Sequence, residues 1–275
     1  MPNAVKIWRA ADLGGAELLK AKYVRHIYPP HSHETVSLGL VTRGAVELRT
    51  RRNTGIAEQG SFVLINSEEI HEGWSADPEG WECRTLHVMP HMIQSTLEEF
   101  RVFTKPKPAV FCGPTIEDAD LATAFLELHR CSETEGSSLE RQSQTVMLIS
   151  RLLRLHTEAR IEPAVGVREP NAVRRARAYL DENLSEKVTL VELAREADLT
   201  PFRLLRAFRA TVGVSPHEYQ LQARVRVATQ MLRRKVPLVS AAHALGFSDQ
   251  AHLTRVFKSI MGSTPGQFRT AELHR

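Results

Sequence analysis

The sequence predicts a multidomain α+β protein, with a β-rich N-terminal domain that ends in helices and an all-helical C-terminal domain. Up to about residue 114, short segments such as TVSLGLV and SFVLI alternate with the period of a β-strand. From about Thr115 the apolar residues recur every third or fourth position, as in helices. Residues 204–219, LLRAFRATVGVSPHEY, nearly return forty-nine residues later as LTRVFKSIMGSTPGQF, residues 253–268. The chain has 275 residues, long enough for each domain to bury its own core.

The composition is typical of a globular protein from a reducing compartment. The chain has 42% hydrophobic residues, no apolar run of about 18 residues that could span a membrane, and no apolar signal segment at its start. Cys83, Cys112 and Cys131 are far apart and form no Cys-x-x-Cys pair, so we expect free thiols rather than disulfides. These features predict a cytoplasmic protein with no membrane partner.

Residues 1–114 are expected to form a β-barrel or sandwich. The strand-like segments are short and closely spaced, and Gly44, Gly55, Gly60 and the turn 77–80 separate them. Many short strands with turns between them are typical of a closed or two-layered β architecture.

Residues 115–158 are expected to add two helices to this domain. Their periodic apolar positions are Leu121, Phe125 and Leu128, and then Val146, Ile149, Leu153 and His156. A further stripe on the second helix consists of Leu148, Leu152 and Leu155. This stripe either packs on the barrel or forms the interface of a homodimer. Residues 159–170 contain two prolines, one glycine and no periodicity, which predicts a linker.

Residues 171–275 are expected to form only helices, because helix start and stop signals follow one another. The expected N-caps are Asn171, Thr189, Thr200, Ser215 and Ser248, and Pro237 opens a further short helix. Thr189 also has Glu192 three residues later, the pattern of a capping box. Gly213 and Gly262 are placed to end the two copies of the repeated stretch.

Each copy of the repeat is expected to be the second helix of a helix-turn-helix unit. The short turns ADLT and GFSD connect LVELAREA and LVSAAHAL to the two copies. From residue 171 onward there are 17 Lys and Arg against 9 Asp and Glu, a balance of +8, whereas the preceding part has a balance of −4. A helical bundle that reuses packing residues is the alternative, but the local positive charge favours binding to double-stranded DNA.

The two faces of the repeated helix are expected to have different roles. Leu204 and Phe208, like Leu253 and Phe257, are four residues apart and therefore share the face that packs into the domain core. Arginine pairs with guanine in the major groove, glutamine with adenine, and apolar groups with the thymine methyl. The expected DNA-binding residues are Phe202, Leu205, Arg206, Arg209, Gln250, Ala251, Thr254, Arg255 and Lys258.

The helix between the two units explains their separation in the sequence. Residues 217–235 form a rod of roughly 28 Å at about 1.5 Å per residue. The same face of a groove returns about every 34 Å along a duplex. One rigid helix is therefore expected to present both recognition helices to successive major-groove segments, with Arg209 and Lys258 placed for phosphate contacts.

The C-terminal hundred residues resemble the DNA-binding domain of the AraC/XylS transcription regulators. The family's motifs are matched by Ala242 with Gly246-Phe247, by Leu253, Arg255, Phe257 and Lys258, and by Gly262, Pro265, Phe268 and Arg269. The resemblance implies that Phe202, Leu205, Arg206, Gln250, Ala251, Thr254 and Arg255 occupy base-facing positions. It also implies a small-molecule effector bound by the N-terminal domain, a dimer formed by the helical layer, and RNA polymerase as a partner.

Residues 20–90 are similar to the cupin barrel. His31 and His33 match the His-x-His of its first motif, and His71 matches the histidine of the second. Two residues apart on a strand, the first pair is expected to share a face. The glutamate position of the first motif falls on Ser37.

The histidines make the barrel a candidate effector site. Three imidazoles can hold a transition metal with an open position for chemistry, or serve as hydrogen-bonding groups of a ligand pocket. Because the motif's carboxylate is missing, we expect no metal and no cofactor, and we assign effector binding to His31, His33, His71 and Trp74.

These features together predict a sequence-specific DNA-binding transcriptional regulator that is controlled by an effector in its N-terminal barrel and is not an enzyme. One alternative is a metal-dependent cupin enzyme fused to a DNA-binding domain. A purely architectural DNA-binding protein without a ligand is another.

Overall fold

The computed structural model describes residues 3–273 except 52, 103–110, 112, 135, 158–160 and 164–168. Cys112 and most of the expected linker lie outside the described residues. The chain divides into two compact units: the first comprises residues 1–134 and 144–165, and the second comprises 135–143 and 166–275. None of the helices in the described part of the chain is long and apolar enough to cross a membrane.

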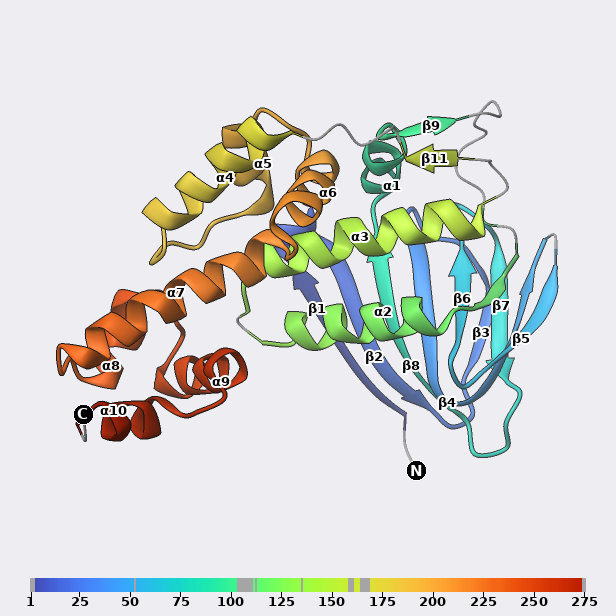
Figure 1. The fold of residues 1–275 in the computed structure, drawn as a ribbon. Helices are drawn as coiled ribbons and strands as arrows, with labels where there is room; N and C mark the ends of the chain where they lie inside the picture. Colours follow the sequence, from blue (N-terminus) through green and yellow to red (C-terminus); the bar gives the residue numbers. More distant parts are fainter. Residues whose placement is uncertain are drawn as a thin grey trace. The chain divides into compact units, whose positions relative to one another are not determined.

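The first unit contains an antiparallel nine-stranded sheet that curls into a barrel (Figure 1). One path of neighbouring strands is β1 (Ala4–Ala10), β2 (Ala16–Tyr23), β8 (Trp81–Val88), β4 (Val36–Thr50), β6 (Ser61–Ile65) and β10 (Thr115–Glu117). The remaining strands are β3 (Ile27–His31), β5 (Thr54–Glu58) and β7 (His71–Ser75). β4 belongs to both groups, because its first half pairs with β8 and β6 and its second half with β7 and β5.

A glycine allows β4 to change partners. Gly44 has φ +70°, and a Cβ there would meet the carbonyl oxygen of Gly80 at 2.1 Å. Only glycine tolerates both the left-handed conformation and this close approach. The bend at Gly44 lets the long strand turn from one half of the barrel into the other.

Alternation along the strands separates the interior of the barrel from the face covered by helices. Tyr23, Val41, Val46, Ala57 and Trp81 form a buried cluster inside. On the other face of the sheet, the rings of Phe62 and Phe125 meet edge to face at 5.3 Å. The predicted β-barrel and the predicted α+β class are therefore confirmed.

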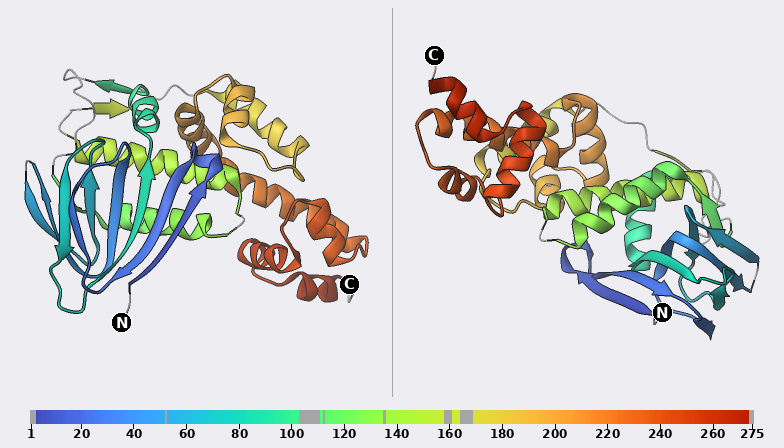
Figure 2. Two further views of the ribbon diagram at one scale, coloured as in Figure 1. Left: turned by 180° about the vertical axis from the view of Figure 1, so that it is seen from behind. Right: turned by 90° about the horizontal axis from the view of Figure 1, so that it is seen from below.

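Two helices cover one face of the sheet, as predicted. They are α2 (Ala119–Ser132) and α3 (Ser138–His156), and the views in Figure 2 show both on the same side. The first turns of α3 group with the second unit. The short helix α1 (Pro90–Leu97) was not expected.

The apolar stripe on α3 is mostly internal. Leu148 and Leu152 are 2% and 0% exposed, while Leu155 is 49% exposed. Two of the three leucines therefore already have packing partners within the chain. Contrary to our expectation, the stripe is not a free surface for a dimer. Burial of such side chains stabilises a fold by about 1.5–3 kcal/mol each, which is why they turn inward.

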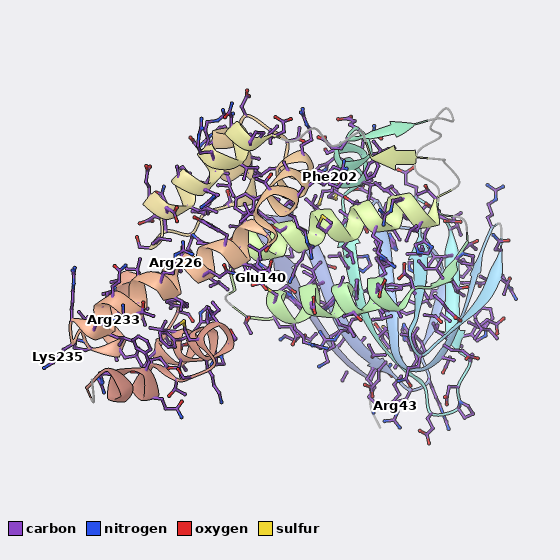
Figure 3. The ribbon with its side chains drawn as sticks, in the orientation of Figure 1. Arg43, Glu140, Phe202, Arg226, Arg233 and Lys235 are labelled. Carbon is purple, nitrogen blue, oxygen red and sulfur yellow. The ribbon has the colours of Figure 1, made fainter. Side chains whose placement is uncertain are left out.

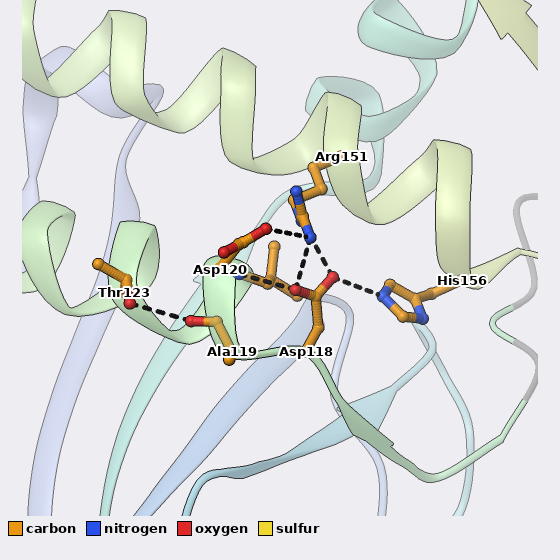
Figure 4. A network of polar contacts seen from close by, with 7 residues as sticks. Asp118, Ala119, Asp120, Thr123, Arg151 and His156 are labelled. Carbon is orange, nitrogen blue, oxygen red and sulfur yellow. Dashed lines mark hydrogen bonds and ion pairs between the residues drawn. The ribbon is translucent and has the colours of Figure 1, made fainter.

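The helix layer is held by a polar network at the start of α2 (Figure 4). The Asp118 side chain accepts a hydrogen bond from the Leu121 backbone N–H at 3.0 Å and thereby caps α2. Arg151 on α3 donates to both carboxylate oxygens of Asp118, at 2.7 and 2.9 Å, and His156 Nε2 lies 3.1 Å from Oδ2. A second carboxylate, on Asp120, also accepts from Arg151 at 3.1 Å.

Part of the expected linker is a strand. β11 (Ile161–Pro163) pairs antiparallel with β9 (Phe100–Val102). The prolines and missing periodicity suggested no structure there. Pairing between residues about sixty positions apart is a tertiary feature that local sequence does not reveal.

The second unit is all helical, as predicted. Its helices are α4 (Pro170–Glu182), α5 (Leu190–Ala197), α6 (Pro201–Val212), α7 (Pro216–Arg233), α8 (Leu238–Ala244), α9 (Gln250–Met261) and α10 (Pro265–Leu273). Thr189, Thr200 and Ser215 cap α5, α6 and α7, and Gly213 and Gly262 end α6 and α9 in the left-handed conformation.

Two of the predicted caps are wrong. Asn171 lies inside α4, whose first residue is Pro170, and no side chain caps that helix. Asp249 rather than Ser248 caps α9, because its carboxylate accepts from the His252 backbone N–H at 2.6 Å. A proline is favoured as the first residue of a helix, and aspartate is as good an N-cap as serine, so local signals alone could not choose.

Candidate DNA interface and effector site

The two recognition helices are α6 and α9, each preceded by a short helix and a tight turn. Asp198, with φ 55°, ends α5, and Gly246, with φ 70°, lies in the turn after α8. Leu204 and Phe208 of α6 and Leu253 and Phe257 of α9 are all fully buried. The predicted core faces of the helix-turn-helix units are therefore confirmed.

The opposite face of α9 is open. Gln250, Ala251, Arg255 and Lys258 are exposed, and Thr254 is half-buried with its hydroxyl donating to the Gln250 carbonyl at 2.8 Å. These side chains offer a guanidinium, an ammonium, an amide and two small groups on one helix surface. That combination fits the edges of base pairs and the phosphates beside them.

The corresponding face of α6 differs from that of α9. Phe202 and Leu205 are only 5% exposed, so as the structure has them neither side chain is available to a base edge. Their counterparts forty-nine residues later are Ala251 and Thr254, which are small enough to stay at a surface. The contacts of Phe202 and Leu205 with bases stay predictions, although both side chains are buried here, as large apolar side chains gain free energy by burial.

The polar residues of α6 are better placed. Arg206 is half-buried, with its guanidinium 5.6 Å from the Phe202 ring centroid, and Arg209 is exposed. The Arg206 head group therefore lies over a ring face and keeps its charge near the surface. Both arginines remain predicted DNA contacts.

The helix α7 connects the two helix-turn-helix units, as the sequence predicted. Tyr219 near its start packs on Phe208 of α6, with ring centroids 5.7 Å apart. Val225, Ala228 and Leu232 further along belong to the same buried cluster as the core of α8 and α9. At about 1.5 Å per residue, its 18 residues make a rod of roughly 27 Å.

A buried arginine in α7 ties the two halves of this domain together. Arg224 donates to the carbonyl oxygens of Leu184, Glu186 and Gly246, at 2.6, 3.1 and 3.2 Å. Burial lowers the pKa of its guanidinium to about 10. Sequence analysis missed this residue, although an arginine three residues after Leu221 and four before Ala228, on an apolar seam, was a signal.

Further basic side chains line α7. Arg226, Arg233 and Lys235 lie along this helix and directly after it (Figure 3). Arg226 is 3.8 Å from the Asp181 carboxylate, and the Arg233 guanidinium is 5.7 Å from the Phe268 ring centroid. They add to the positive field around the recognition helices, which attracts polyanions.

The three predicted barrel histidines do meet. The ring centroids of His31 and His71 are 4.2 Å apart, and those of His33 and His71 are 5.0 Å apart. The expectation that His31 and His33 share one face of a strand is wrong, because β3 ends at His31 and His33 lies beyond the strand. The loop after β3, rather than strand alternation, turns His33 toward the other rings.

A fourth imidazole completes the group, which we call the imidazole cluster: His31, His33, His71 and His87. His87 lies on β8, with its ring centroid 5.4 Å from that of His33. Ser37, at the cupin glutamate position, is opposite His87 in the β4–β8 register, and its hydroxyl lies 2.6 Å from His87 Nδ1. Sequence analysis missed His87 because only strand pairing brings it beside residues fifty positions earlier.

Trp74 is not part of the imidazole cluster. It lies three residues after His71 on β7 and therefore points to the other face of the strand. Its indole Nε1 donates to Glu47 at 3.0 Å, and the Arg49 guanidinium lies 5.2 Å from its ring centroid. Trp74 therefore lies apart from these histidines, and its role in effector binding stays a prediction.

The imidazole cluster does not fit the cupin metal site. Ser37 replaces the carboxylate, and its hydroxyl oxygen lies 3.2 Å from His33 Nε2, the atom that a metal would need. Among the described residues, no group of three or more His, Cys, Asp or Glu side chains is arranged to hold a metal ion.

Burial keeps three members of the imidazole cluster, His33, His71 and His87, neutral at neutral pH. Desolvation lowers the pKa of His33 and His71, and it lowers the pKa of His87 to about 4. Hydrogen bonds from the rings to backbone carbonyls oppose this effect for His33 and His71 but do not outweigh it.

Comparison with known proteins agrees with this architecture. Residues 13–155 match the AraC-like ligand binding domain, and residues 193–271 match a helix-turn-helix domain. An uncharacterized HTH-type transcriptional regulator of Bacillus subtilis, YbfI, is 27% identical and covers 86% of this chain and 85% of its own. The arabinose operon regulatory protein of Escherichia coli is 24% identical, covering 84% of this chain and 79% of its own.

Two further matches are a third relative and a solved structure. The probable transcriptional regulator LumQ of Photobacterium leiognathi is 29% identical over 88% of this chain and 91% of its own. The C-terminal domain of AraT, a response regulator from Geobacillus stearothermophilus, is 28% identical and covers 38% of this chain and 88% of that chain, with a TM-score of 0.36. The ligand-binding model covers more than half of the sequence and a helix-turn-helix model follows it, so this chain belongs to the AraC family of transcriptional regulators.

Proposed function

We propose that this regulator recognises its operator mainly through α9, with α6 contributing Arg206 and Arg209. The exposed face of α9 is the observation that carries the proposal, because it presents Gln250, Thr254 and Arg255 next to one another while Leu253 and Phe257 anchor the helix from behind. Arginine and glutamine side chains can each make two hydrogen bonds to one base edge. Such paired hydrogen bonds distinguish one base pair from another in the major groove.

Arg209 and Lys258 take the phosphates in this proposal. Each lies near the end of its recognition helix, one helical turn beyond the base-facing positions, and both are exposed. Contacts to phosphates position the protein and contribute affinity that falls steeply with salt, but they do not select a sequence.

The chain acts as a regulator and not as an enzyme in this proposal, in the cytoplasm, under the control of an effector held by the barrel. Homodimerisation and contact with RNA polymerase belong to the proposal on the strength of the family resemblance. A dimer would have to use residues other than the buried leucines of α3.

The test compares two arginine variants on an operator selected from a random DNA pool. Arg255→Ala is expected to weaken specific binding by about 5- to 150-fold, the equivalent of ~1–3 kcal/mol, and to relax preference at one base position. Arg174→Ala is the control, since Arg174 is also an exposed arginine but lies on α4, outside both recognition helices. If band-shift titrations give both variants the same affinity, the assignment of α9 is wrong.

Lys258→Ala provides an independent check. It should weaken binding to all sequences alike and reduce the slope of log K against log salt by about 1. A loss confined to the selected operator would instead make Lys258 a base contact.

A further inference from the structure

Backbone contacts fix which ring nitrogen carries the proton in three members of the imidazole cluster. Nδ1 of His31, His33 and His71 lies 2.8, 2.9 and 2.8 Å, respectively, from a backbone carbonyl oxygen two residues away. A carbonyl oxygen only accepts hydrogen bonds, so Nδ1 is the protonated nitrogen in each ring. In the neutral form of each ring, Nε2 therefore carries a lone pair.

The fourth ring follows from the first three. Because His33 Nε2 carries a lone pair, the Ser37 hydroxyl 3.2 Å away donates to it. The same oxygen lies 2.6 Å from His87 Nδ1 and is then left to accept, so His87 Nδ1 is also protonated. The Ser37 hydroxyl therefore links His33 and His87, and both rings carry their proton on Nδ1.

Three of the four lone pairs are open. Nε2 of His31, His71 and His87 makes no hydrogen bond within the described part of the chain, while each ring uses Nδ1. None of these atoms is among the fully buried side-chain atoms without a partner in that part. His31 and His87 are half-buried, so the cluster reaches the surface of the barrel, at the ends of the strands that carry these residues.

The two carboxylates that act on rings of the cluster, Glu17 and Glu69, have partners of their own. Glu17 on β2 is opposite His87 in the β2–β8 register, and its carboxylate is 3.4 Å from Arg9 Nε. The Glu69 carboxylate accepts instead from Asn66 at 2.8 Å. Within the described residues, no lysine or arginine is hydrogen-bonded to the four rings.

We propose that the imidazole cluster binds an uncharged ligand with at least two O–H or N–H donors, such as a polyol, and rejects carboxylates. A carboxylate offers only acceptors, and acceptors facing the bare Nε2 atoms lose their hydration without gaining a hydrogen bond. A hydroxyl-bearing ligand can donate to two or three of these nitrogens at once. This inference rests on the proposed function only in placing the effector in the barrel.

The proton arrangement can be measured without any ligand. Long-range ¹H–¹⁵N spectra of the full chain, labelled at histidine, should show bare Nε2 and protonated Nδ1 for all four rings at neutral pH. Ser37→Ala should leave His31 and His71 unchanged and mix the two proton positions in His87. Ser61→Ala is the matched control, because Ser61 is a buried serine on β6. Protonated Nε2 in His31 or His71 would overturn the proposal.

The ligand class is tested with matched pairs of probes, namely linear polyols of three to six carbons and the aldonates of the same lengths. Each is added at ~10 mM, well below the concentrations at which osmolytes act by exclusion from the surface. At least one polyol should shift the histidine resonances and bind at least tenfold more tightly than its aldonate. Equal binding of aldonates, the absence of shifts with every polyol, or stoichiometric uptake of Zn²⁺ with loss of the polyol effect would each overturn the proposal.

Variants of His71 separate chemistry from shape. His71→Phe removes the lone pair and should reduce polyol binding at least tenfold, whereas His71→Gln retains an acceptor and should recover most of it. Equal losses in both would mean that His71 only shapes the site, against the proposal. DNA binding is measured in parallel on the same proteins. A failure of the Arg255 test with polyol binding intact would refute the operator assignment and leave this inference standing.

Discussion

Replacing Asp118 by alanine should destabilise the N-terminal unit far more than removing its neighbour Asp120. Asp118 has three partners, the Leu121 backbone N–H, Arg151 and His156, and its side chain is 7% exposed (Figure 4). Asp120 touches the same Arg151, but its side chain is 81% exposed. The two carboxylates therefore differ in burial and capping rather than in charge.

The magnitude follows from two contributions. Loss of an N-cap costs about 1 kcal/mol. Breaking the pair with Arg151, whose side chain is 30% exposed, costs about 2 kcal/mol, between ~0–1 for exposed pairs and ~3–5 for buried ones. Together these lower the free energy of unfolding by about 3 kcal/mol, or the Tm by about 6–12 °C for a unit of this size. Asp120→Ala should cost at most ~0.5 kcal/mol.

Tryptophan fluorescence is a suitable assay, because Trp8, Trp74 and Trp81 are the three tryptophans of the chain and all lie in the first unit. Thermal unfolding of the wild type and both variants at pH 7 gives the comparison directly. If Asp118→Ala and Asp120→Ala shift the Tm equally, the network does not hold α2 to α3 as argued.

The loss of stability in Asp118→Ala should also depend on pH. Hydrogen bonds from Arg151 hold the pKa of the Asp118 carboxyl well below its usual range. A depressed pKa stabilises the folded state above the unfolded value of about 3.9, and this stability is lost as the pH falls below it. The Tm difference between the wild type and Asp118→Ala should therefore persist from pH 7 to about pH 5 and shrink near pH 3.

Three further predictions concern single sites. Gly246→Ala should lower the denaturation midpoint, measured by circular dichroism, much more than Gly213→Ala. Both glycines have a positive φ, but a Cβ at 246 would meet a backbone oxygen at 2.3 Å, whereas a Cβ at 213 would meet nothing within 4 Å. Equal losses of stability in the two variants would show that this steric clash does not matter. Thr189→Ala should cost about 1 kcal/mol by removing the capping box with Glu192, and an unchanged midpoint would show that the box is dispensable. Burial lowers the pKa of His129 to about 4, so the neutral ring contributes stability that is complete above about pH 6.5 and is lost as the pH falls toward 4. His129→Gln should therefore make the Tm less dependent on pH between 6.5 and 4. A Tm profile identical to that of the wild type would refute this role of His129.

Helix boundaries in the second unit could largely be predicted, because each depends on a few neighbouring residues. Thr189 with Glu192 and Thr200 with Pro201 satisfy the free N–H groups of a helix start within one turn. The prediction failed where two adjacent residues were both suitable, as at Ser248 and Asp249. There the choice depends on how the preceding turn presents the side chain.

The effector site could be predicted only in part. The pattern of histidines in the sequence pointed to three of the four imidazoles, but His87 lies on a strand whose partner begins about fifty residues earlier. Trp74 is different, because its spacing of three residues from His71 already places the two side chains on opposite faces of any strand that contains both. Strand register is set by contacts across the sheet rather than by local sequence.

The sequence by itself determined the two-domain plan, the duplicated helix-turn-helix and the family, since periodicity, caps and motif spacing are all encoded within short stretches of chain. Only the tertiary structure decided which face of a recognition helix is free. The apolar residues Phe202 and Leu205 and their small counterparts Ala251 and Thr254 occupy matching positions, yet two are buried and the others remain at or near the surface. Burial depends on neighbours that arrive from distant parts of the chain, and the free energy gained by removing a large apolar side chain from water then outweighs its place in a repeated motif.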